Sequence, residues 1–451
     1  MLAFDSLIRP LVVIDGWTVG SYFSLKDKFI LLNTMNQTQS VIPHIIDQHA
    51  EEAAFLWLLR HNAVYAPHYN LKDLAKLDNR VEAHIDGLRI AGDYGWEACC
   101  TNLEFKEPGE VFAAGLLALE GNNIDRINKV YQVAEETPET LTGLISAFGW
   151  VEPHLLRGKV SELLVSKNPL WRQAGIAACA IHRVDPGKYL DQAIGDDNTQ
   201  LRDRALKAAG ELGRVDLKQM VLDQVNDQAP AFDFWAAWSA VMLGGRGKAL
   251  SALQSIIIEG SYFSIKAMQL AFRVLDLHAI KELMKVLVQN EDRVRESVMG
   301  AGMSGDPSYI PWLIKQMKVP KLAKIAGESF SFITGVDIAY EDLEGVLPEE
   351  FTAGPTENSE DEDVAMDADE DLLFPDPLLI DQWWKQRQQN FVPGQRYLLG
   401  KPINQIQCQL VLRTGKQRHL QAAALELALM QPATLLFETR AVGKRQQKWL
   451  S

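Results

Sequence analysis

The segment Asp197-Asn-Thr-Gln-Leu-Arg-Asp-Arg-Ala-Leu206 is one copy of a pattern that recurs through the middle of the chain. Successive copies begin 30, 30, 34, 29 and 29 residues apart, and a core-type side chain stands six residues after each opening residue. The opening residues are Arg172, Arg202, Phe232, Lys266, Arg295 and Lys324. The core-type residues are Ala178, Ala208, Trp238, Phe272, Ala301 and Phe330.

A second short amphipathic segment follows each copy, so the pattern predicts two packed helices per period. The second segments are Lys188–Ile194, Leu217–Val225, Ala249–Ile258, Ile280–Val288 and Tyr309–Met317. In an α-solenoid no unit buries its apolar face until its neighbours stack on it. We therefore expect an all-α fold, a right-handed α-solenoid of HEAT-like helix pairs with an acidic loop and a smaller C-terminal region. The alternative is a run of amphipathic helices without a true repeat.

Five regions follow from these patterns and from the composition on either side of them. They are a poorly patterned extension (1–41), an N-terminal helical region (42–166), the repeats (167–335), an acidic linker (336–381) and a basic C-terminal region (382–451). Outside the repeats, Ile42 to about Tyr65 predicts a strong amphipathic helix and Leu71–Ala91 another, and Gln417–Met430 is the best helix of the C-terminal region. Gln405–Leu412 alternates apolar and polar residues and is ambiguous between strand and helix.

Composition excludes several classes of protein. With 47% apolar residues and 11 Trp among 451 residues, the chain is not disordered throughout. Leu7–Ile14 is interrupted by Arg9 and Pro10 and makes a poor signal peptide, and no apolar run is long enough to span a bilayer. The four cysteines, Cys99, Cys100, Cys179 and Cys408, suit buried reduced thiols. These features predict a cytoplasmic protein.

Charge is divided unevenly near the C-terminus. Residues 356–381 carry eleven acidic side chains and no Lys or Arg, whereas residues 382–451 carry eleven Lys and Arg against Glu426 and Glu438. We expect the acidic block either to be a solvated loop, to bind a basic partner, or to lie along the basic C-terminal region and mask it. The net charge of −14 argues against nucleic acid as the main partner.

The acidic block and the two tryptophans beside it are the predicted partner-binding residues. Adjacent tryptophans point to different faces, so one of them is often available to an interface, although a domain core uses them too. The predicted residues are Glu360, Asp361, Glu362, Asp363, Asp367, Asp369, Glu370, Asp371, Trp383 and Trp384.

Sequence patterns for metal, cofactor or catalytic sites are weak. Five histidines cluster in one segment, where hydrogen bonds between helices are a better interpretation than a metal site. They are His44, His49, His61, His68 and His84. Asp367–Asp371 resembles the start of a calcium loop, but Leu372 stands where an EF-hand needs Gly. No nucleophile elbow or phosphate-binding loop is present, so we expect no cofactor, no metal and no enzyme activity.

Several short motifs resemble a bacterial family of HEAT-like proteins over about residues 44–450. They are His49-Ala-Glu-Glu-Ala-Ala-Phe-Leu-Trp57, Val81-Glu-Ala-His-Ile-Asp-Gly-Leu-Arg89, His182-Arg-Val-Asp-Pro-Gly187, Ala326-Gly-Glu-Ser-Phe330, Glu360-Asp-Glu-Asp-Val-Ala-Met-Asp367 and Leu435-Leu-Phe-Glu-Thr-Arg440. Members of that family have no established biochemical activity and are often encoded beside type VI secretion components. The resemblance therefore implies a role in effector delivery or protection, and it supplies no catalytic residues.

These observations predict a non-enzymatic scaffold that binds another protein, such as a secreted effector or a spike-tip component, as adaptor or chaperone. The concave face of the repeats is expected to supply the binding area, and no nucleic acid or membrane is expected as partner. One alternative is an immunity protein that neutralises a toxin. Another is a HEAT-like enzyme, a lyase or DNA glycosylase, which the net charge and the lack of a catalytic motif disfavour.

Overall fold

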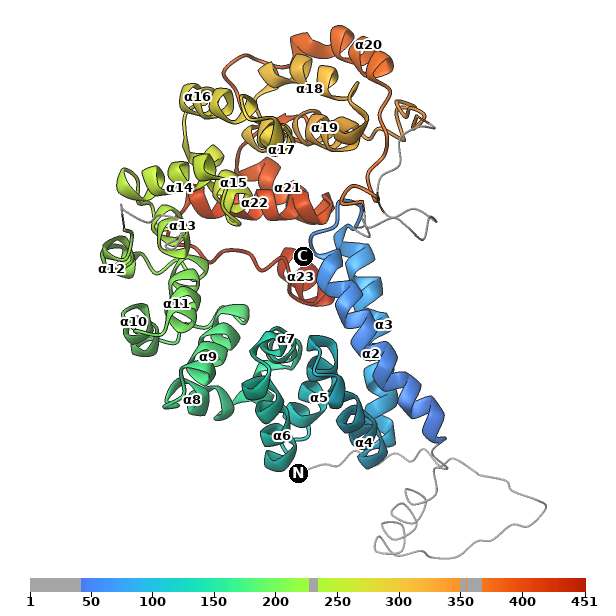
Figure 1. Cartoon of the computed structure of the whole chain (residues 1–451), viewed down its shortest axis with the longest axis vertical. Coiled ribbons are helices and arrows are strands. Elements are labelled where there is room, and N and C mark those ends of the chain that lie inside the picture. Colours follow the sequence, from blue (N-terminus) through green and yellow to red (C-terminus); the bar gives the residue numbers. More distant parts are fainter. Residues whose placement is uncertain (1–41, 227–233, 349–353, 355–366) are drawn as a thin grey trace, which may run out of the picture.

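The computed structural model describes residues 42–226, 234–348, 354 and 367–451, and these form an all-α protein whose helices pack in sequential pairs (Figure 1). The predicted extension 1–41 and the opening residue Phe232 lie outside the described residues. The helices of the N-terminal half are α2 (Pro43–Ala63), α3 (Leu71–Ala91), α4 (Asp93–Asn102), α5 (Pro108–Glu120), α6 (Ile124–Glu136), α7 (Leu141–Trp150), α8 (Lys159–Leu164), α9 (Pro169–Ile181), α10 (Lys188–Ile194), α11 (Thr199–Glu211) and α12 (Lys218–Asp223).

The second half continues with the same short helices and ends in a differently arranged C-terminal region. Its helices are α13 (Phe234–Met242), α14 (Lys248–Glu259), α15 (Ser264–Val274), α16 (Leu277–Val288), α17 (Val294–Ser304), α18 (Ile310–Gln316), α19 (Pro320–Thr334), α20 (Pro377–Arg387), α21 (Gln405–Thr414), α22 (Gln417–Met430) and α23 (Gly443–Leu450). None of the helices in the described part of the chain is both long and apolar enough to cross a membrane.

Short polar residues set where many of these helices begin. The Asn198 side chain accepts a hydrogen bond from the Leu201 N–H at the start of α11, and Asp276 accepts from Ala279 at the start of α16. Such caps satisfy backbone donors that the first turn of a helix leaves free. The helix starts are therefore encoded locally, which is why the sequence pattern located them.

The six predicted core positions are all buried, with exposed fractions between 0% and 7%. They lie on α9, α11, α13, α15, α17 and α19, which pack on one another in succession, and each intervening short helix packs on the helix that follows it. One continuous apolar cluster extends from Leu164 on α8 through these pairs to Trp384 on α20, and a second fills the N-terminal helices from Ala50 to Ala178. The predicted burial of these six positions is thus confirmed.

The described β-structure is a hairpin of two-residue strands, β1 (Tyr397–Leu398) and β2 (Lys401–Pro402), which pair antiparallel. Gln405–Leu412, ambiguous from its sequence, is helical and belongs to α21. The Asn404 side chain accepts from the Gln407 N–H and starts this helix, while Cys408, Val411 and Leu412 are buried at helical spacing.

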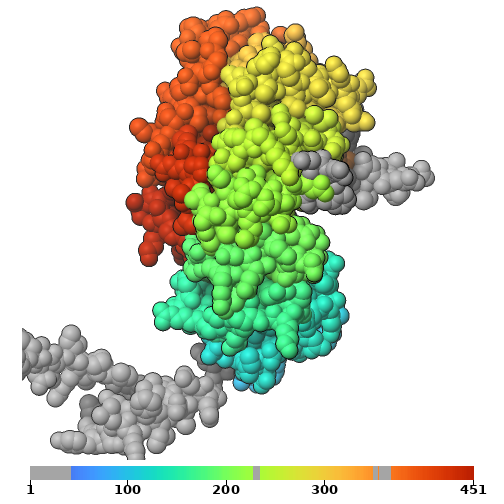
Figure 2. Space-filling view, turned by 90° about the vertical axis from the view of Figure 1, so that its left-hand side faces the viewer, coloured from blue at the N-terminus to red at the C-terminus, as the bar shows by residue number. Residues whose placement is uncertain are grey.

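The helix pairs follow one another around an arc that starts at α2 and α3 and ends at α20 (Figure 1). Seen from its outer side, the middle of the arc presents a continuous surface on which successive segments follow one another in chain order, with the C-terminal residues along one edge (Figure 2). The C-terminal region returns along the inner side, where α22 packs on α15 and α23 packs on α3. It therefore joins parts of the chain that are far apart in sequence.

Candidate functional site

The C-terminal region supplies hydrogen-bond donors to helix ends that face the inner side of the arc. An α-helix leaves its last carbonyl groups without an internal donor and carries a partial negative charge at that end. The Tyr397 N–H donates to the Gly305 carbonyl after α17 (2.8 Å), and the Leu399 N–H donates to the Phe332 carbonyl of α19 (2.9 Å). These contacts satisfy acceptors that the helices themselves leave open.

Arginine side chains of the C-terminal region also donate hydrogen bonds to carbonyl groups at or near helix ends. The pairs are Arg396 Nε with the Ser304 carbonyl of α17 (2.9 Å), Arg418 Nε with the Tyr65 carbonyl after α2 (2.8 Å), and Arg445 Nη1 with the Gly149 carbonyl of α7 (2.7 Å). A cation near a helix C-terminus is stabilised by the helix dipole. Three of the eleven Lys and Arg of residues 382–451 therefore bind carbonyl groups at or just after the ends of other helices.

Residues 431–446, which we call the C-terminal strap, cross the inner side from α22 to α23. The Leu436 N–H donates to the Glu211 carbonyl at the end of α11 (2.9 Å), and the Gly443 N–H donates to Asp78 Oδ2 on α3 (2.5 Å). The strap thus ties the middle of the arc to its N-terminal end. The inner side, where the concave face of the repeats was expected to supply binding area, is crossed here by the chain itself.

Two glycines show how closely the C-terminal region approaches the helix pairs. Gly213 and Gly305 follow α11 and α17 with φ of +62° and +69°. A Cβ at Gly213 would lie 2.6 Å from the Thr434 carbonyl oxygen, and one at Gly305 would lie 2.5 Å from that of Tyr397. Only glycine combines this backbone conformation with the missing side chain, so both turns are shaped for the chain that crosses them.

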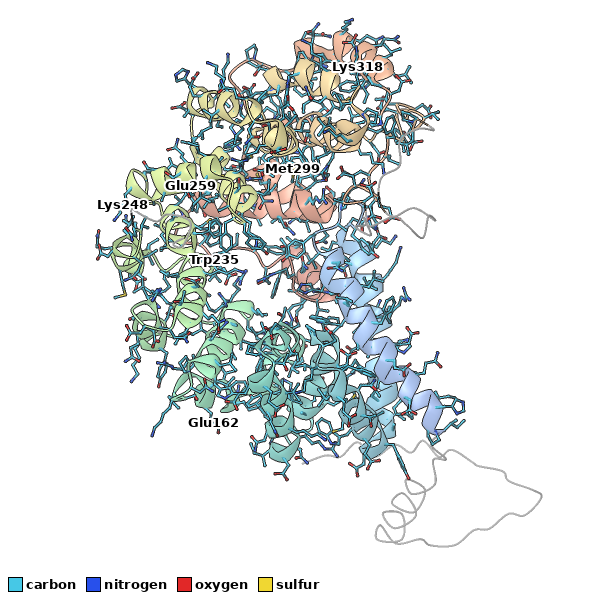
Figure 3. The ribbon with its side chains drawn as sticks, in the orientation of Figure 1. Glu162, Trp235, Lys248, Glu259, Met299 and Lys318 are labelled. Atoms are coloured by element: carbon cyan, nitrogen blue, oxygen red, sulfur yellow. The ribbon has the colours of Figure 1, made fainter. Side chains whose placement is uncertain are left out.

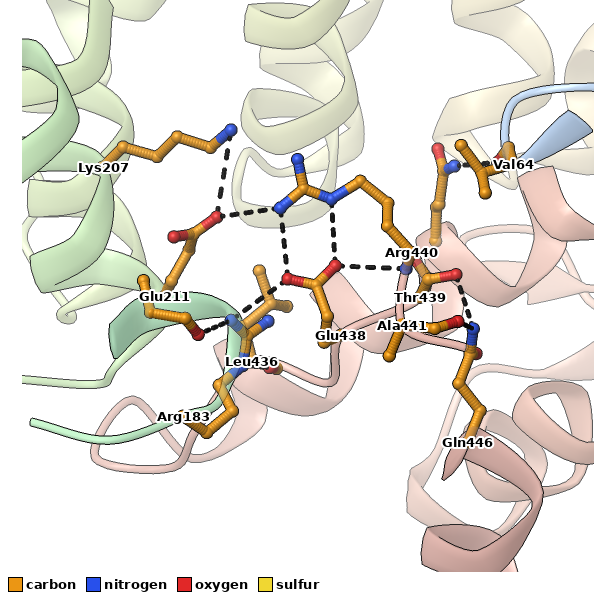
Figure 4. Close-up of polar contacts among 12 residues, drawn as sticks. Val64, Arg183, Lys207, Glu211, Leu436, Glu438, Thr439, Arg440, Ala441 and Gln446 are labelled. Atoms are coloured by element: carbon orange, nitrogen blue, oxygen red, sulfur yellow. Dashed lines mark hydrogen bonds and ion pairs between the residues drawn. The ribbon is translucent and has the colours of Figure 1, made fainter. Parts of the chain in front are cut away.

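A group of charges around two buried carboxylates, Glu211 and Glu438, which we call the strap cluster, holds the strap to α11 (Figure 4). It comprises Arg183, Arg204, Lys207, Glu211, Glu438 and Arg440. The Glu438 carboxylate accepts from Arg440 Nε (2.9 Å) and lies 3.2 Å from Arg183 Nη1. Glu211 accepts from Arg204 Nη2 (3.0 Å), and Arg440 Nη2 lies 3.6 Å from it. Arg440 therefore bridges the carboxylates of α11 and the strap.

Burial and neighbouring charge change the pKa values in the strap cluster. Burial alone would raise the pKa of Glu211, but the charges of Arg204 and Lys207 outweigh it and lower that pKa to about 2. In the same way Arg440 and Arg183 outweigh burial and hold the pKa of Glu438 well below its ordinary value. Burial, assisted by the charge of Arg440, lowers the pKa of Lys207 to about 7. Both carboxylates are thus ionised at neutral pH, while Lys207 is close to losing its proton.

We expect Lys207 to make the free energy of unfolding rise with pH between about 7 and 10.5. In that range the unfolded chain keeps the lysine proton that the folded chain has lost, so unfolding takes up a proton and becomes less favourable as pH increases. Urea midpoints at several pH values should show this rise in the parent and a smaller rise in Lys207→Met. Lys188→Met, at an exposed position on α10, is the matched control. The same pH dependence in parent and Lys207→Met would contradict the prediction.

Two cavities flank the strap cluster, and Lys207, Glu438 and Arg440 line both. The α2-side cavity, of about 230 Å³, also has walls from α2 and α7. The α13-side cavity, of about 150 Å³, is lined by Trp235, whose ring centroid lies 4.6 Å from Lys207 Nζ. Figure 3 shows Trp235 and Met299 on the inner side of the arc, whereas Lys248 lies at its outer edge. The strap thus leaves two small hollows in which charged side chains stand beside aromatic rings.

The described part of the acidic block contacts the helix pairs. Asp369, with its side chain 6% exposed, makes two hydrogen bonds of 2.6 Å with Arg295 on α17. Asp367 accepts from Lys324 Nζ on α19 (2.9 Å), and Arg295 and Lys324 are two of the repeat-opening residues. The hypothesis that the block masks the basic C-terminal region is wrong for these residues, since they pair with the repeats.

The remaining predicted partner-binding residues are scattered. Glu370 is exposed, and Asp371 lies 3.3 Å from His68. Residues 360–363 lie outside the described residues. Among the acidic residues that the structure describes, Asp367 and Asp369 lie together, and both are paired with the chain's own cations.

Trp383 and Trp384 lie on α20, which begins at Pro377 inside the predicted linker, where Asp376 caps it. Trp384 is 8% exposed and packs on Phe391, with 5.2 Å between ring centroids. Trp383 packs edge-on against Phe330, with 5.6 Å between centroids. Both rings thus pack within the chain, which favours the core alternative over an interface.

The other candidate sites have structural roles. His49 and His84 are hydrogen-bonded across α2 and α3 (3.1 Å), as the interhelical interpretation predicted. Within the described ranges no three His, Cys, Asp or Glu side chains group as metal ligands. The four cysteines are free, and burial raises the pKa of Cys99 to about 12, so this thiol is a packed side chain.

The strap cluster was missed from sequence because its members come from three separate segments, and no spacing within the sequence shows that these segments meet. The signal that could have indicated it is the pair of carboxylates, Glu426 and Glu438, isolated in a basic region. Both are buried and paired with arginines. Comparison with known proteins finds no matching family model, no significantly similar curated protein and no significantly similar solved structure.

Proposed function

We propose that the chain is a non-enzymatic scaffold that binds another protein, and the exposed apolar face of α2 carries this proposal. Phe55 and Leu58 are 60% and 51% exposed, although Leu56 and Trp57 on the opposite side are buried. A surface helix normally has one apolar face, whereas α2 has two. Neighbouring exposed apolar side chains commonly mark an interaction site.

The partner that suits this face has apolar side chains next to basic ones. Asp47 and Glu51 are exposed and precede Phe55 at intervals of four residues, so the three lie in a row along α2. Acidic side chains beside the apolar ones favour a basic partner, chiefly through the rate of association and through specificity. The overall charge of −14 also favours a basic partner.

A right-handed HEAT-like α-solenoid is the architecture we propose for the helix pairs. The regular spacing of buried core positions and the sequential packing support it. Such proteins present long surfaces to partners, and the strap would leave the outer side and α2 for that purpose. The resemblance of the sequence to HEAT-like proteins encoded beside type VI secretion genes supports a cytoplasmic adaptor or chaperone for a secreted effector or spike component.

An affinity experiment with matched variants tests the proposal. The parent, Phe55→Ser/Leu58→Ser and Tyr262→Ser would each be used to capture proteins from host extract, followed by mass spectrometry. Tyr262 is 87% exposed on another part of the arc, so its replacement controls for lost apolar surface alone. We expect a basic effector or spike component to be retained by the parent and the Tyr262 variant, and to be reduced at least tenfold by the α2 variant.

Two results would count against this function. A partner retained equally by all three chains would show that α2 is not the binding face. Sedimentation of the parent as a dimer that the α2 variant abolishes would show that the face binds a second copy of this chain instead.

A further inference from the structure

The α2-side cavity has an excess of positive charge, and this feature does not depend on the proposed scaffold function. Arg60, Arg204, Lys207 and Arg440 line it, and Glu438 is its one carboxylate among the described residues. These cations come from three separate elements, α2, α11 and the strap. The cavity therefore exists only when the strap is docked.

The partners of these cations do not balance their charge. Asp78 pairs with Arg60, while Glu211 and Glu438 are shared by the four cations of the strap cluster. Five cationic side chains, Arg60 and the four of the strap cluster, are thus paired with three carboxylates. This leaves an excess of about two positive charges when Lys207 is protonated.

One buried donor in this cavity wall lacks an acceptor. Arg204 Nη1 is buried and makes no hydrogen bond, although Nη2 of the same guanidinium binds Glu211. A buried donor without a partner costs free energy, so this guanidinium is incompletely paired where it stands. The pKa of His61, also in the wall, is lowered by burial and then by the charges of Arg440 and Arg60. The local potential is therefore positive.

The opposite wall is aromatic and apolar. Trp57 and Trp150 line the cavity, and the Arg60 guanidinium lies 5.6 Å from the centroid of the Trp150 ring. The volume of about 230 Å³ is below the roughly 300–1,000 Å³ of pockets for drug-sized ligands. A ligand here must be small, with an anionic end and a flat apolar end.

We propose that the α2-side cavity binds a small aromatic phosphate ester, with its phosphate among Arg204, Lys207 and Arg440 and its ring against Trp57 and Trp150. A phosphate dianion would offset the excess positive charge of these side chains. Because Arg440 belongs to the strap, a bound ligand would also stabilise the docked strap.

Calorimetric titration of the full chain with phenyl phosphate at neutral pH tests this site. We expect binding by the parent, with affinity reduced about tenfold or more in Lys207→Met, as for the loss of one charge-assisted hydrogen bond. Lys188→Met, on the outer side of the arc, should bind as the parent does. Phenol and inorganic phosphate are the ligand controls, and each should bind more weakly than phenyl phosphate.

A second readout does not depend on the folding of a variant. Lys207, whose pKa is about 7, should react with trinitrobenzenesulfonate at neutral pH, and phenyl phosphate should slow that reaction at Lys207 but not at Lys188. Peptide mass spectrometry distinguishes the two sites. No binding by the parent, unchanged affinity in Lys207→Met, or equal labelling of Lys207 with and without ligand would overturn the proposal. Equal affinity for inorganic phosphate would overturn its aromatic part.

Discussion

Asp78→Ala should lower the free energy of unfolding by about 3–5 kcal/mol, the usual cost of removing one partner from a buried ion pair. Asp78 is 2% exposed and accepts from Arg60 Nε (2.9 Å) and from the Gly443 N–H. Its loss would leave the Arg60 charge buried without a carboxylate and would release the end of the strap from α3. Urea unfolding followed by tryptophan fluorescence measures the change.

Asp73→Ala on the same helix is the matched control. Asp73 pairs with Lys76, and both side chains are largely solvated, at 37% and 65% exposed. Exposed pairs of this kind contribute roughly 0–1 kcal/mol. Equal destabilisation by the two variants would show that the Asp78 contact does not anchor the strap.

Glu438→Gln should have a comparably large effect, again about 3–5 kcal/mol, because it leaves Arg183 and Arg440 without the charge that both contact. The amide keeps the size of the side chain, so the change removes charge rather than packing. Thermal and urea unfolding should both show the loss, and Arg183 and Arg440 should become more susceptible to trypsin cleavage.

The pH dependence of this destabilisation tests whether the negative charge of Glu438 is its cause. The pKa of Glu438 is lowered in the folded chain, so its stabilisation is present above the ordinary pKa of 4.5 and is lost as pH falls below it. The difference between parent and Glu438→Gln should therefore shrink as pH is lowered from 7 to about 3. A difference that is constant with pH would mean that the carboxylate charge is not what stabilises the strap.

Most helices could be predicted from the sequence because they are specified locally. The Leu71–Ala91 and Gln417–Met430 patterns match α3 and α22 residue for residue, and Asn and Asp caps start α11 and α16. The core register could be predicted for the same reason, since a helix of a given length fixes which residues face inward. Helix α20 was missed because Pro377 and the acidic residues before it resemble a linker.

The return of the C-terminal region could not be predicted, since it depends on contacts between residues hundreds of positions apart. Arg60 and Ala441, for example, are 381 residues apart in sequence and form a hydrogen bond of 2.9 Å. The basic composition of residues 382–451 was visible, but its partners are helix carbonyl ends, which no side-chain pattern reveals. The candidate site was therefore placed on the acidic block, where charge is most obvious in the sequence.

Hydrogen exchange of the strap amides tests most directly the central claim that the C-terminal strap closes the inner side of the arc. The Leu436 N–H and the Gly443 N–H are bonded to α11 and α3, respectively. If the strap is docked, peptides covering residues 436–446 should exchange as slowly as α11. Their amides would then become accessible to solvent only when the helix pairs of the arc unfold. Rapid exchange of the strap while α11 stays protected would contradict the account.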